Sequence, residues 1–180
     1  ISSDLYKNPN WFELLKDHVF AKSWQFICDV KTIANHRDIF PYRFLDSFID
    51  EPLILINNHN SFQSYSNVCT HRGNLLIKNP GNYSQIQCGY HGRRFDLSGN
   101  FLHMPSTEGM LNFPCADDNL MKISTQKIGN LIFNSLNPIF DLNEIVNNIS
   151  SKIQDYKLSD LNFREEYSQD YLVQANWALY

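Results

Sequence analysis

Two short segments, Cys69-Thr70-His71-Arg72-Gly73 and Cys88-Gly89-Tyr90-His91-Gly92, carry the most specific chemistry in this 180-residue sequence. Each segment offers one thiolate and one imidazole, and sixteen residues lie between His71 and Cys88. Soft thiolate together with imidazole suits an iron–sulfur cluster or a zinc ion. A zinc site on the same side chains and a disulfide between the two cysteines are the structural alternatives. The candidate metal ligands are Cys69, His71, Cys88 and His91.

The residues around these ligands are typical of tight loops. Glycine follows each ligand pair, and it permits sharp turns and a close approach of backbone N–H groups to sulfur. Such hydrogen bonds stabilise the more negative, reduced form of an iron–sulfur cluster. Pro80-Gly81 lies in the connecting segment, where we expect it to help bring the two loops together. The residues expected to support the loops are Arg72, Gly73, Tyr90 and Gly92.

The rest of the sequence has the pattern of a mainly β protein. Runs rich in aromatic and β-branched residues alternate with Asn, Asp, Gly and Pro. Their spacing predicts an antiparallel sandwich or small barrel. Strands are expected over residues 24–29, 42–48, 52–57, 62–67, 121–126 and 131–135, with turns at 57–60, 79–82, 96–100 and 129–130.

A helix is expected on each side of the β region. Asn8 and Pro9 match an N-cap and a first helical residue, and helical spacing continues to about Lys22. Asp141 is a plausible N-cap for a short helix over 142–153. A last strand is expected over 164–174, and the apolar end of the sequence suggests truncation of something longer. The stripe expected to face the core in the first helix is Trp11, Leu14, Leu15, His18 and Val19.

Composition limits the partners and the compartment. Hydrophobic residues make up 43% of the sequence, enough for a core, and the net charge is −4. No basic stripe indicates nucleic acid, no polybasic cluster indicates a membrane surface, and no apolar run reaches the roughly 18 residues of a membrane helix. No signal peptide pattern is visible, so we expect a cytoplasmic protein whose cysteines bind metal rather than form disulfides.

Cysteines and histidines outside the two segments are expected to have ordinary structural places. Cys28 lies in an apolar strand and Cys115 follows Phe113-Pro114, so both are expected to be buried or partly buried thiols. The remaining histidines are expected to be surface or core residues; they are His18, His36, His59 and His103.

The two segments resemble the Rieske domain of Rieske non-haem iron oxygenases, the α-subunits of ring-hydroxylating dioxygenases and their relatives that act on quaternary amines. The resemblance continues into the run from Phe95 to Gly99. Weaker likenesses follow in the same order as in the family, with Phe20 and Trp24 in the lead-in and Asn176-Trp177 near the end. The resemblance to Rieske domains implies a cluster-binding subdomain that holds a [2Fe–2S] cluster, in which two Cys hold one iron and two His hold the other.

Particular positions place the sequence within the Rieske proteins. Members of respiratory and photosynthetic complexes carry an extra cysteine in each loop, where this sequence has Asn74 and Tyr90. Their serine and tyrosine hydrogen-bond donors correspond to Arg93 and Phe95, which have no hydroxyl. Both differences favour the low-potential branch. Oxygenases usually have Trp where Arg93 stands, and Arg93-Arg94 is expected to put a charged pair beside the cluster.

The resemblance implies that the complete protein is a mono- or dioxygenase that hydroxylates or demethylates a small organic substrate with O₂. A reductase or ferredoxin would supply electrons, and a homotrimer is implied. The mononuclear Fe(II), held by two His and a carboxylate, is expected in a C-terminal domain outside this sequence, because no histidine follows His103. No catalytic residue is therefore expected in this chain.

On the same basis, residues 1–38 form a helical lead-in, 39–138 the Rieske [2Fe–2S] domain and 139–180 the start of the connection to the catalytic domain. The segment from Met104 to Phe113 is more similar to choline- and betaine-type oxygenases than to dioxygenases of aromatic hydrocarbons. The alternative function is that of a free-standing soluble Rieske ferredoxin, which acts only as an electron carrier.

Overall fold

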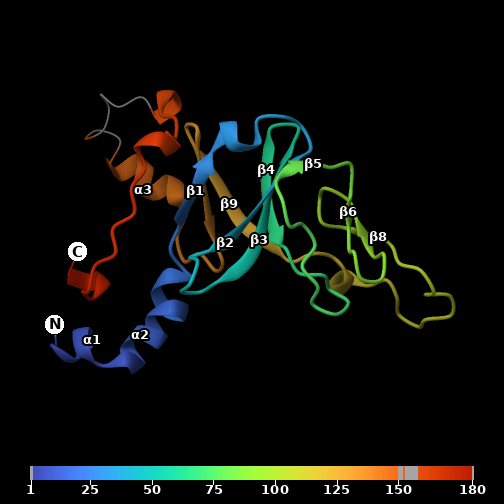
Figure 1. The fold of residues 1–180 in the computed structure, drawn as a ribbon, viewed down its shortest axis with the longest axis horizontal. Coiled ribbons are helices and arrows are strands. Elements are labelled where there is room, and N and C mark those ends of the chain that lie inside the picture. Colours follow the sequence, from blue (N-terminus) through green and yellow to red (C-terminus); the bar gives the residue numbers. More distant parts are fainter. Residues whose placement is uncertain (1, 150–151, 153–157, 180) are drawn as a thin grey trace.

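The computed structural model describes residues 2–149, 152 and 158–179, and two antiparallel sheets dominate them (Figure 1). Three short strands form the smaller sheet: β6 (Ile86–Gln87), β7 (Arg94–Phe95) and β8 (Phe101–His103). The larger sheet has the strand order β1 (Gln25–Asp29), β10 (Leu131–Ser135), β9 (Lys122–Ile128), β4 (Ser61–Ser66), β3 (Glu51–Asn58), β2 (Asp38–Phe44) and β5 (Gly81–Asn82). The expected mainly β, antiparallel fold is confirmed.

Strand β3 is the centre of the larger sheet because apolar side chains cover both of its faces. The four residues Leu53–Ile56 are fully buried. Ile54 and Ile56 belong to the core beside the smaller sheet, while Leu55 packs with Cys28 on the opposite side. A continuous apolar run is what a strand buried on both faces requires, and the strand predicted over 52–57 is confirmed.

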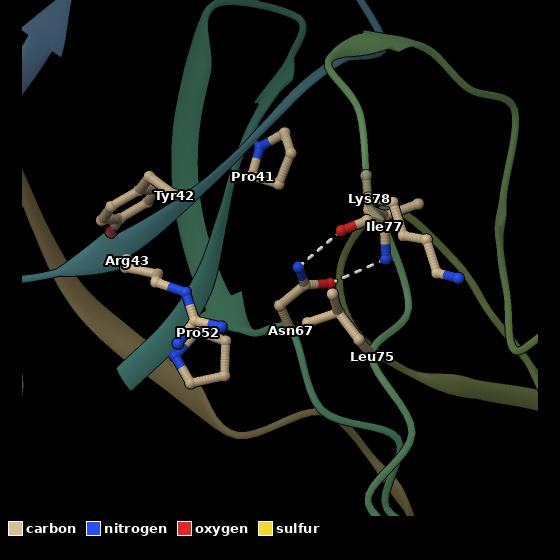
Figure 2. A pocket seen from close by; sticks show the side chains of 8 residues that line it. All are labelled: Pro41, Tyr42, Arg43, Pro52, Asn67, Leu75, Ile77 and Lys78. Atoms are coloured by element: carbon tan, nitrogen blue, oxygen red, sulfur yellow. Dashed lines mark hydrogen bonds between the residues drawn. The ribbon is translucent and has the colours of Figure 1, made fainter. Parts of the chain in front are cut away.

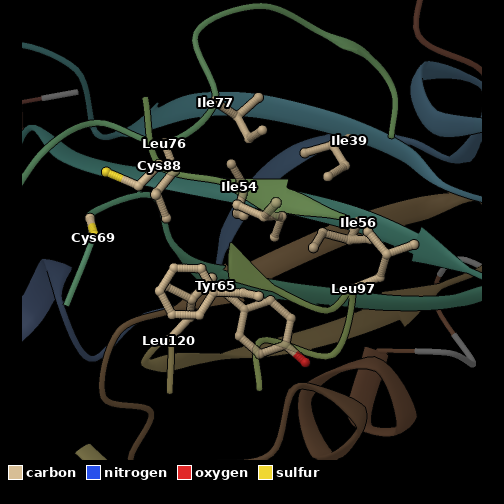
Figure 3. Close-up of a cluster of buried hydrophobic side chains, with 12 residues drawn as sticks. Ile39, Ile54, Ile56, Tyr65, Cys69, Leu76, Ile77, Cys88, Leu97 and Leu120 are labelled. Carbon is tan, nitrogen blue, oxygen red and sulfur yellow. The ribbon is translucent and has the colours of Figure 1, made fainter. Parts of the chain in front are cut away.

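The largest core cluster joins the two sheets (Figure 3). It combines side chains of β2, β3 and β4 with side chains of the segment that carries the two motifs, and both motif cysteines lie at its border. Because these cysteines are part of a packed apolar cluster, the position of their loops is tied to the core. Its buried members are Ile39, Ile54, Ile56, Tyr65, Cys69, Leu76, Ile77, Ile86, Cys88, Phe95, Leu97 and Leu120.

The turns predicted at 57–60, 96–100 and 129–130 are found, whereas the turn expected at 79–82 is wrong, because Gly81–Asn82 form β5 and pair with β2. The turn between β3 and β4 has positive φ at His59 (54°) and Asn60 (63°), as a tight hairpin requires. Between β7 and β8, the Asp96 carboxylate accepts hydrogen bonds from the N–H groups of Ser98 and Asn100, both at 2.8 Å. This second turn joins β7 to β8, and its Leu97 belongs to the core cluster.

The N-terminal helix is confirmed, but its expected orientation is wrong. It comprises α1 (Asp4–Lys7), α2 (Pro9–Leu15) and a π-helical turn over Lys16–Phe20, and Asn8 caps α2 by accepting from the Asn10 N–H. Four of the five members of the predicted core-facing stripe are exposed, with Trp11 at 44% and Leu14 at 49%. The rings of Phe12 and Phe20 instead contact Phe48, at 4.9 and 5.0 Å between centroids, so a neighbouring face of the helix packs on the domain.

The C-terminal part differs more from expectation. Helix α3 (Leu142–Ile149) begins with Asp141 accepting from the Asn143 N–H at 2.7 Å, as predicted, and residue 153 lies outside the described part. The strand expected over 164–174 is wrong: this segment contains a 3₁₀ turn, Glu165–Tyr167, and exposed side chains. A strand needs a neighbour for its hydrogen bonds, and no strand pairs with this segment in the described part.

Shorter elements complete the chain. Further 3₁₀ turns cover Val30–Ile33, Ala116–Asp118, Leu158–Asp160 and Trp177–Leu179. The strand expected over 42–48 ends at Phe44, because Leu45 and Ser47 take positive φ values of 47° and 62° as the chain turns back into β3. None of the helices in the described residues is both long and apolar enough to cross a membrane.

Candidate metal centre

The two motifs form loops with the same backbone hydrogen bonds. In the first loop the Cys69 N–H donates to the Asn74 carbonyl at 2.8 Å, and the Gly73 N–H donates to the Cys69 carbonyl at 3.0 Å. In the second loop the Cys88 N–H donates to the Arg93 carbonyl at 2.8 Å. The Gly92 N–H completes that pattern by donating to the Cys88 carbonyl at 3.1 Å. The two loops therefore share one backbone frame, although His71 is the third residue of the first loop and His91 is the fourth residue of the second.

Glycine is required at the closing position of each loop. Gly73 has φ of +68° and Gly92 has φ of +72°, a region that L side chains adopt only with strain. Pro105 lies 3.6 Å from where a Cβ on Gly92 would stand, so the second loop also packs against the segment after β8. The expectation that these two glycines support the loops agrees with this geometry.

The two motif cysteines are buried next to each other. Cys69 is 3% exposed and Cys88 is 2% exposed, both belong to the same core cluster, and all four cysteines of the chain are free. Burial raises the pKa of Cys69. Burial acts in the same direction on Cys88, but hydrogen bonds from the backbone N–H groups of Tyr90 and His91 outweigh it and place the pKa of Cys88 below its usual value.

The Asn74 side chain adds a further hydrogen bond to the sulfur of Cys88. Its amide Nδ2 lies 3.6 Å from Cys88 Sγ. The sequence comparison had treated position 74 only as a place where an extra cysteine is missing. Its amide is a donor to sulfur in the same loop system, and donors of this kind stabilise a negative sulfur.

The two motif histidines form the second pair. The ring centroids of His71 and His91 lie 4.8 Å apart with the rings tilted by 67°. Burial lowers the pKa of His71, and the neighbouring His91, Arg72 and Arg93 lower it further. His91 Nδ1 is buried and has no hydrogen-bond partner. A buried ring nitrogen rarely lacks a partner, so this atom fits a metal ligand.

The remaining supporting residues lie at the surface. Tyr90 is 60% exposed and its ring centroid lies 3.8 Å from that of His91. Arg72 is exposed, and its charge acts on His71 as described above. The centre is thus buried on the cysteine side, while its histidine side reaches the surface.

The histidines and cysteines outside the motifs lie elsewhere in the fold. His36 and His59 stack on each other at 3.6 Å between ring centroids, and His103 pairs with Arg94 across the smaller sheet. Cys28 is buried, as expected, whereas Cys115 is exposed, which corrects the expectation for that residue. Cys115 is the N-cap of the 3₁₀ turn Ala116–Asp118, and both its carbonyl and its side chain take part in capping that turn at the surface.

Arg93 lies next to the second loop, as expected, but its surroundings were not predicted. It is 3% exposed and makes an ion pair with Asp118, whereas Arg94 is partly exposed. Its guanidinium also lies over the rings of Phe101 and Phe113, at 4.8 and 5.7 Å from the centroids. Asp118 is 25 positions away in the sequence, so no local pattern indicates this pairing.

Asn67 also has a structural role that the sequence analysis did not predict. It lies at the end of β4, 2% exposed, and its amide makes two hydrogen bonds with the backbone of Ile77 (Figure 2). Nδ2 donates to the Ile77 carbonyl at 2.7 Å, and the Ile77 N–H donates to Oδ1 at 2.9 Å. These bonds tie the segment after the first loop to the strand before it, beside a pocket of about 160 Å³.

Comparison with protein families identifies the domain. A family model described as the Rieske [2Fe-2S] domain matches residues 23–114, about half of the chain. The carnitine monooxygenase oxygenase subunit of Escherichia coli K12 is 29% identical over 140 residues, covering 77% of this chain and 36% of the relative. The α-subunit of 2-aminobenzenesulfonate 2,3-dioxygenase from Alcaligenes sp. is 28% identical, covering 76% and 35%. The chain thus spans about a third of the length of these relatives.

Solved structures share the fold. The apo crystal structure of a quaternary ammonium Rieske monooxygenase matches with a TM-score of 0.74 and 20% identity, covering 84% of this chain and 44% of that chain. A naphthalene 1,2-dioxygenase matches with a TM-score of 0.68 and 19% identity, covering 79% and 32%.

Proposed function

Since the chain belongs to the Rieske [2Fe–2S] domain family, we propose that the two cysteines and two histidines of the equivalent loops hold such a cluster. In this proposal the buried thiolates hold one iron and the imidazoles hold the other. The loop residues around them supply backbone and side-chain hydrogen bonds and shield the sulfur side from water. The four ligands are Cys69, His71, Cys88 and His91.

The observation that carries this proposal is the arrangement of the four side chains as two pairs. The two cysteines are buried in one core cluster, and the two imidazole rings are 4.8 Å apart. In the described residues, no group of three or more His, Cys, Asp or Glu side chains is placed to hold a single metal ion. A structural zinc site gathers four ligands around one ion, whereas a Rieske cluster needs two ligands for each of two irons. The pairing supports the cluster over zinc.

The chain's own residues suit one-electron transfer at this site. When bound, the cluster takes up and releases one electron. The backbone N–H groups of Tyr90 and His91 and the Asn74 amide lie at Cys88, where they stabilise negative charge on the sulfur. The histidine side reaches the surface next to the exposed ring of Tyr90, which gives electrons a short route to and from a partner.

The complete protein is, in this proposal, a Rieske oxygenase whose N-terminal part is this chain. Its matched relatives include mono- and dioxygenase subunits. The mononuclear Fe(II) would lie in a C-terminal domain, electrons would come from a reductase or ferredoxin, and the oxygenase would be a homotrimer. Residues 1–38 form the lead-in, 39–138 the Rieske domain and 139–180 the connection; through β1, the lead-in adds an edge strand to the larger sheet.

We propose a quaternary ammonium compound as the substrate. Carnitine monooxygenase and choline monooxygenase subunits are among the relatives, the latter from Arabidopsis thaliana at 27% identity. The full-length protein with a reductase is expected to oxidise carnitine or choline with consumption of O₂. Turnover of 2-aminobenzenesulfonate without turnover of either amine would instead favour an aromatic substrate.

Metal analysis of the purified chain, reconstituted with iron and sulfide under anaerobic conditions, tests the cluster itself. The expected result is two irons and two sulfides per chain and the uptake of one electron from dithionite. Cys88→Ser is expected to lose the cluster, whereas Cys115→Ser, the exposed matched control, keeps it. A colourless protein that holds one zinc ion contradicts the proposal.

A further inference from the structure

Arg93 is a buried cation directly beside the proposed ligands. It follows His91 by two positions, and its carbonyl accepts the hydrogen bond from the Cys88 N–H that closes the second loop. Its side chain is 3% exposed and lies over three aromatic rings, with Phe101 the nearest at 4.8 Å. A buried charge is costly unless an opposite charge and hydrogen bonds accompany it, so the partner of Arg93 matters.

Asp118 is that partner, and it contacts both motif loops. Its carboxylate pairs with the Arg93 guanidinium in the second loop. Its backbone carbonyl accepts a hydrogen bond from Thr70 Oγ1 in the first loop, at 2.9 Å. The side chain of Asp118 is 15% exposed, and its other oxygen accepts from the Cys115 N–H at 2.8 Å, which fixes the carboxylate in its own turn. One residue therefore links the loop of Cys69 to the loop of Cys88.

We propose that Arg93 and Asp118 act as a positioning pair for the cluster, holding the two ligand loops in register and setting the reduction potential by their balance of charge. This inference rests on the proposed cluster. An extra electron on the cluster is stabilised by nearby positive charge and destabilised by nearby negative charge, and in a buried site these effects are screened only weakly. With both partners present the two contributions oppose each other.

The pair makes a prediction about sign that loop support alone does not make. Arg93→Met removes the cation and leaves the Asp118 carboxylate without its partner, so the reduction potential is expected to fall. Asp118→Asn leaves the guanidinium without its partner, so the potential is expected to rise. The double variant has neither charge, and its potential is expected to lie between those of the two single variants. Mere loosening of the loops would shift both single variants in one direction.

The experiment is a spectroscopic redox titration at neutral pH of the cluster-loaded chain and these variants, with Arg94→Met as the matched control. Arg94 has the same charge as Arg93, follows it in the chain and is the first residue of β7, but its side chain is partly exposed. Water and salt screen its charge, so its variant is expected to shift the potential by less than half as much as Arg93→Met.

The outcomes separate this inference from the proposed function. A wild-type chain that holds no cluster overturns the proposed function. A wild-type chain with a cluster whose two single variants shift the potential in the same direction, or by no more than Arg94→Met, overturns only the pair.

If a single variant does not load, Arg93→Lys decides, because it keeps the charge but loses the planar fork and ring stacking. The reduction potential of Arg93→Lys is expected to differ from the wild-type value by no more than that of Arg94→Met does. Its cluster is expected to be lost faster than the wild-type cluster. A potential shift larger than that of Arg94→Met contradicts the inference.

Discussion

Replacing Asn67 with alanine removes two buried hydrogen bonds that hold the segment between the ligand loops. The Ile77 N–H and carbonyl lose their partners, at 2.9 and 2.7 Å, in a place where Asn67 is 2% exposed. An unsatisfied buried backbone group costs about 1–3 kcal/mol, so the two groups predict a loss of about 2–6 kcal/mol in the free energy of unfolding. Water that enters the vacated space moves the value toward the lower end.

The matched control is Asn57→Ala. Asn57 is 1% exposed and also bridges two backbone groups, donating to the Ile33 carbonyl and accepting from the Asn60 N–H, both at 2.8 Å. Urea unfolding of the cluster-loaded proteins is expected to show similar losses for both variants. Bleaching of the visible absorption without denaturant is expected to be faster for Asn67→Ala alone. Equal bleaching rates, or a loss below about 1 kcal/mol for Asn67→Ala, would refute the reasoning.

Two further changes probe the fold and its pH dependence. Gly99→Ala places a Cβ 2.6 Å from the Tyr65 ring at a φ of +78°, whereas Gly109 has a similar φ and open space around it. In urea unfolding, Gly99→Ala is therefore expected to lose about 1–3 kcal/mol more stability than Gly109→Ala. Equal losses would show that the Tyr65 ring moves aside without cost. Burial, followed by the nearby charges of His59 and Arg37, lowers the pKa of His36 below 6.5. Protonation of His36 therefore favours the unfolded state, and the free energy of unfolding is expected to fall as the pH drops below 6.5. His36→Gln should reduce this loss in urea unfolding at about pH 7.5 and about pH 5.5, and an unchanged loss would contradict the assignment.

The sequence was most informative where structure depends on neighbours along the chain. The strands around the run Leu53–Ile56, the hairpin at Asn57–Asn60 and the N-cap at Asp141 follow from local patterns, and the structure has them all. The two Cys-x-His and Cys-x-x-His motifs are equally local. Their loops close within a few residues by hydrogen bonds and by glycines with positive φ.

Features that depend on distant partners were missed or misjudged. The burial of Arg93 depends on Asp118, 25 positions away, and the role of Asn67 depends on Ile77. The packing face of the first helix was assigned to a neighbouring stripe, because Phe48 on another segment decides which rings are covered. The segment over 164–174 mixes two tyrosines and Leu172-Val173 with charged and polar residues, and no described strand lies beside it to accept its hydrogen bonds.

Pulsed EPR of the reduced chain, labelled with ¹⁵N only in histidine, tests the central claim most directly. Two strongly coupled histidine nitrogens are expected, because His71 and His91 would both ligate one iron of the cluster. Both couplings are expected to persist in the variant His36→Gln, because His36 belongs to a separate stacked pair with His59. A reduced iron–sulfur signal without any histidine coupling, or with only one coupled nitrogen, would contradict the assignment of these ligands.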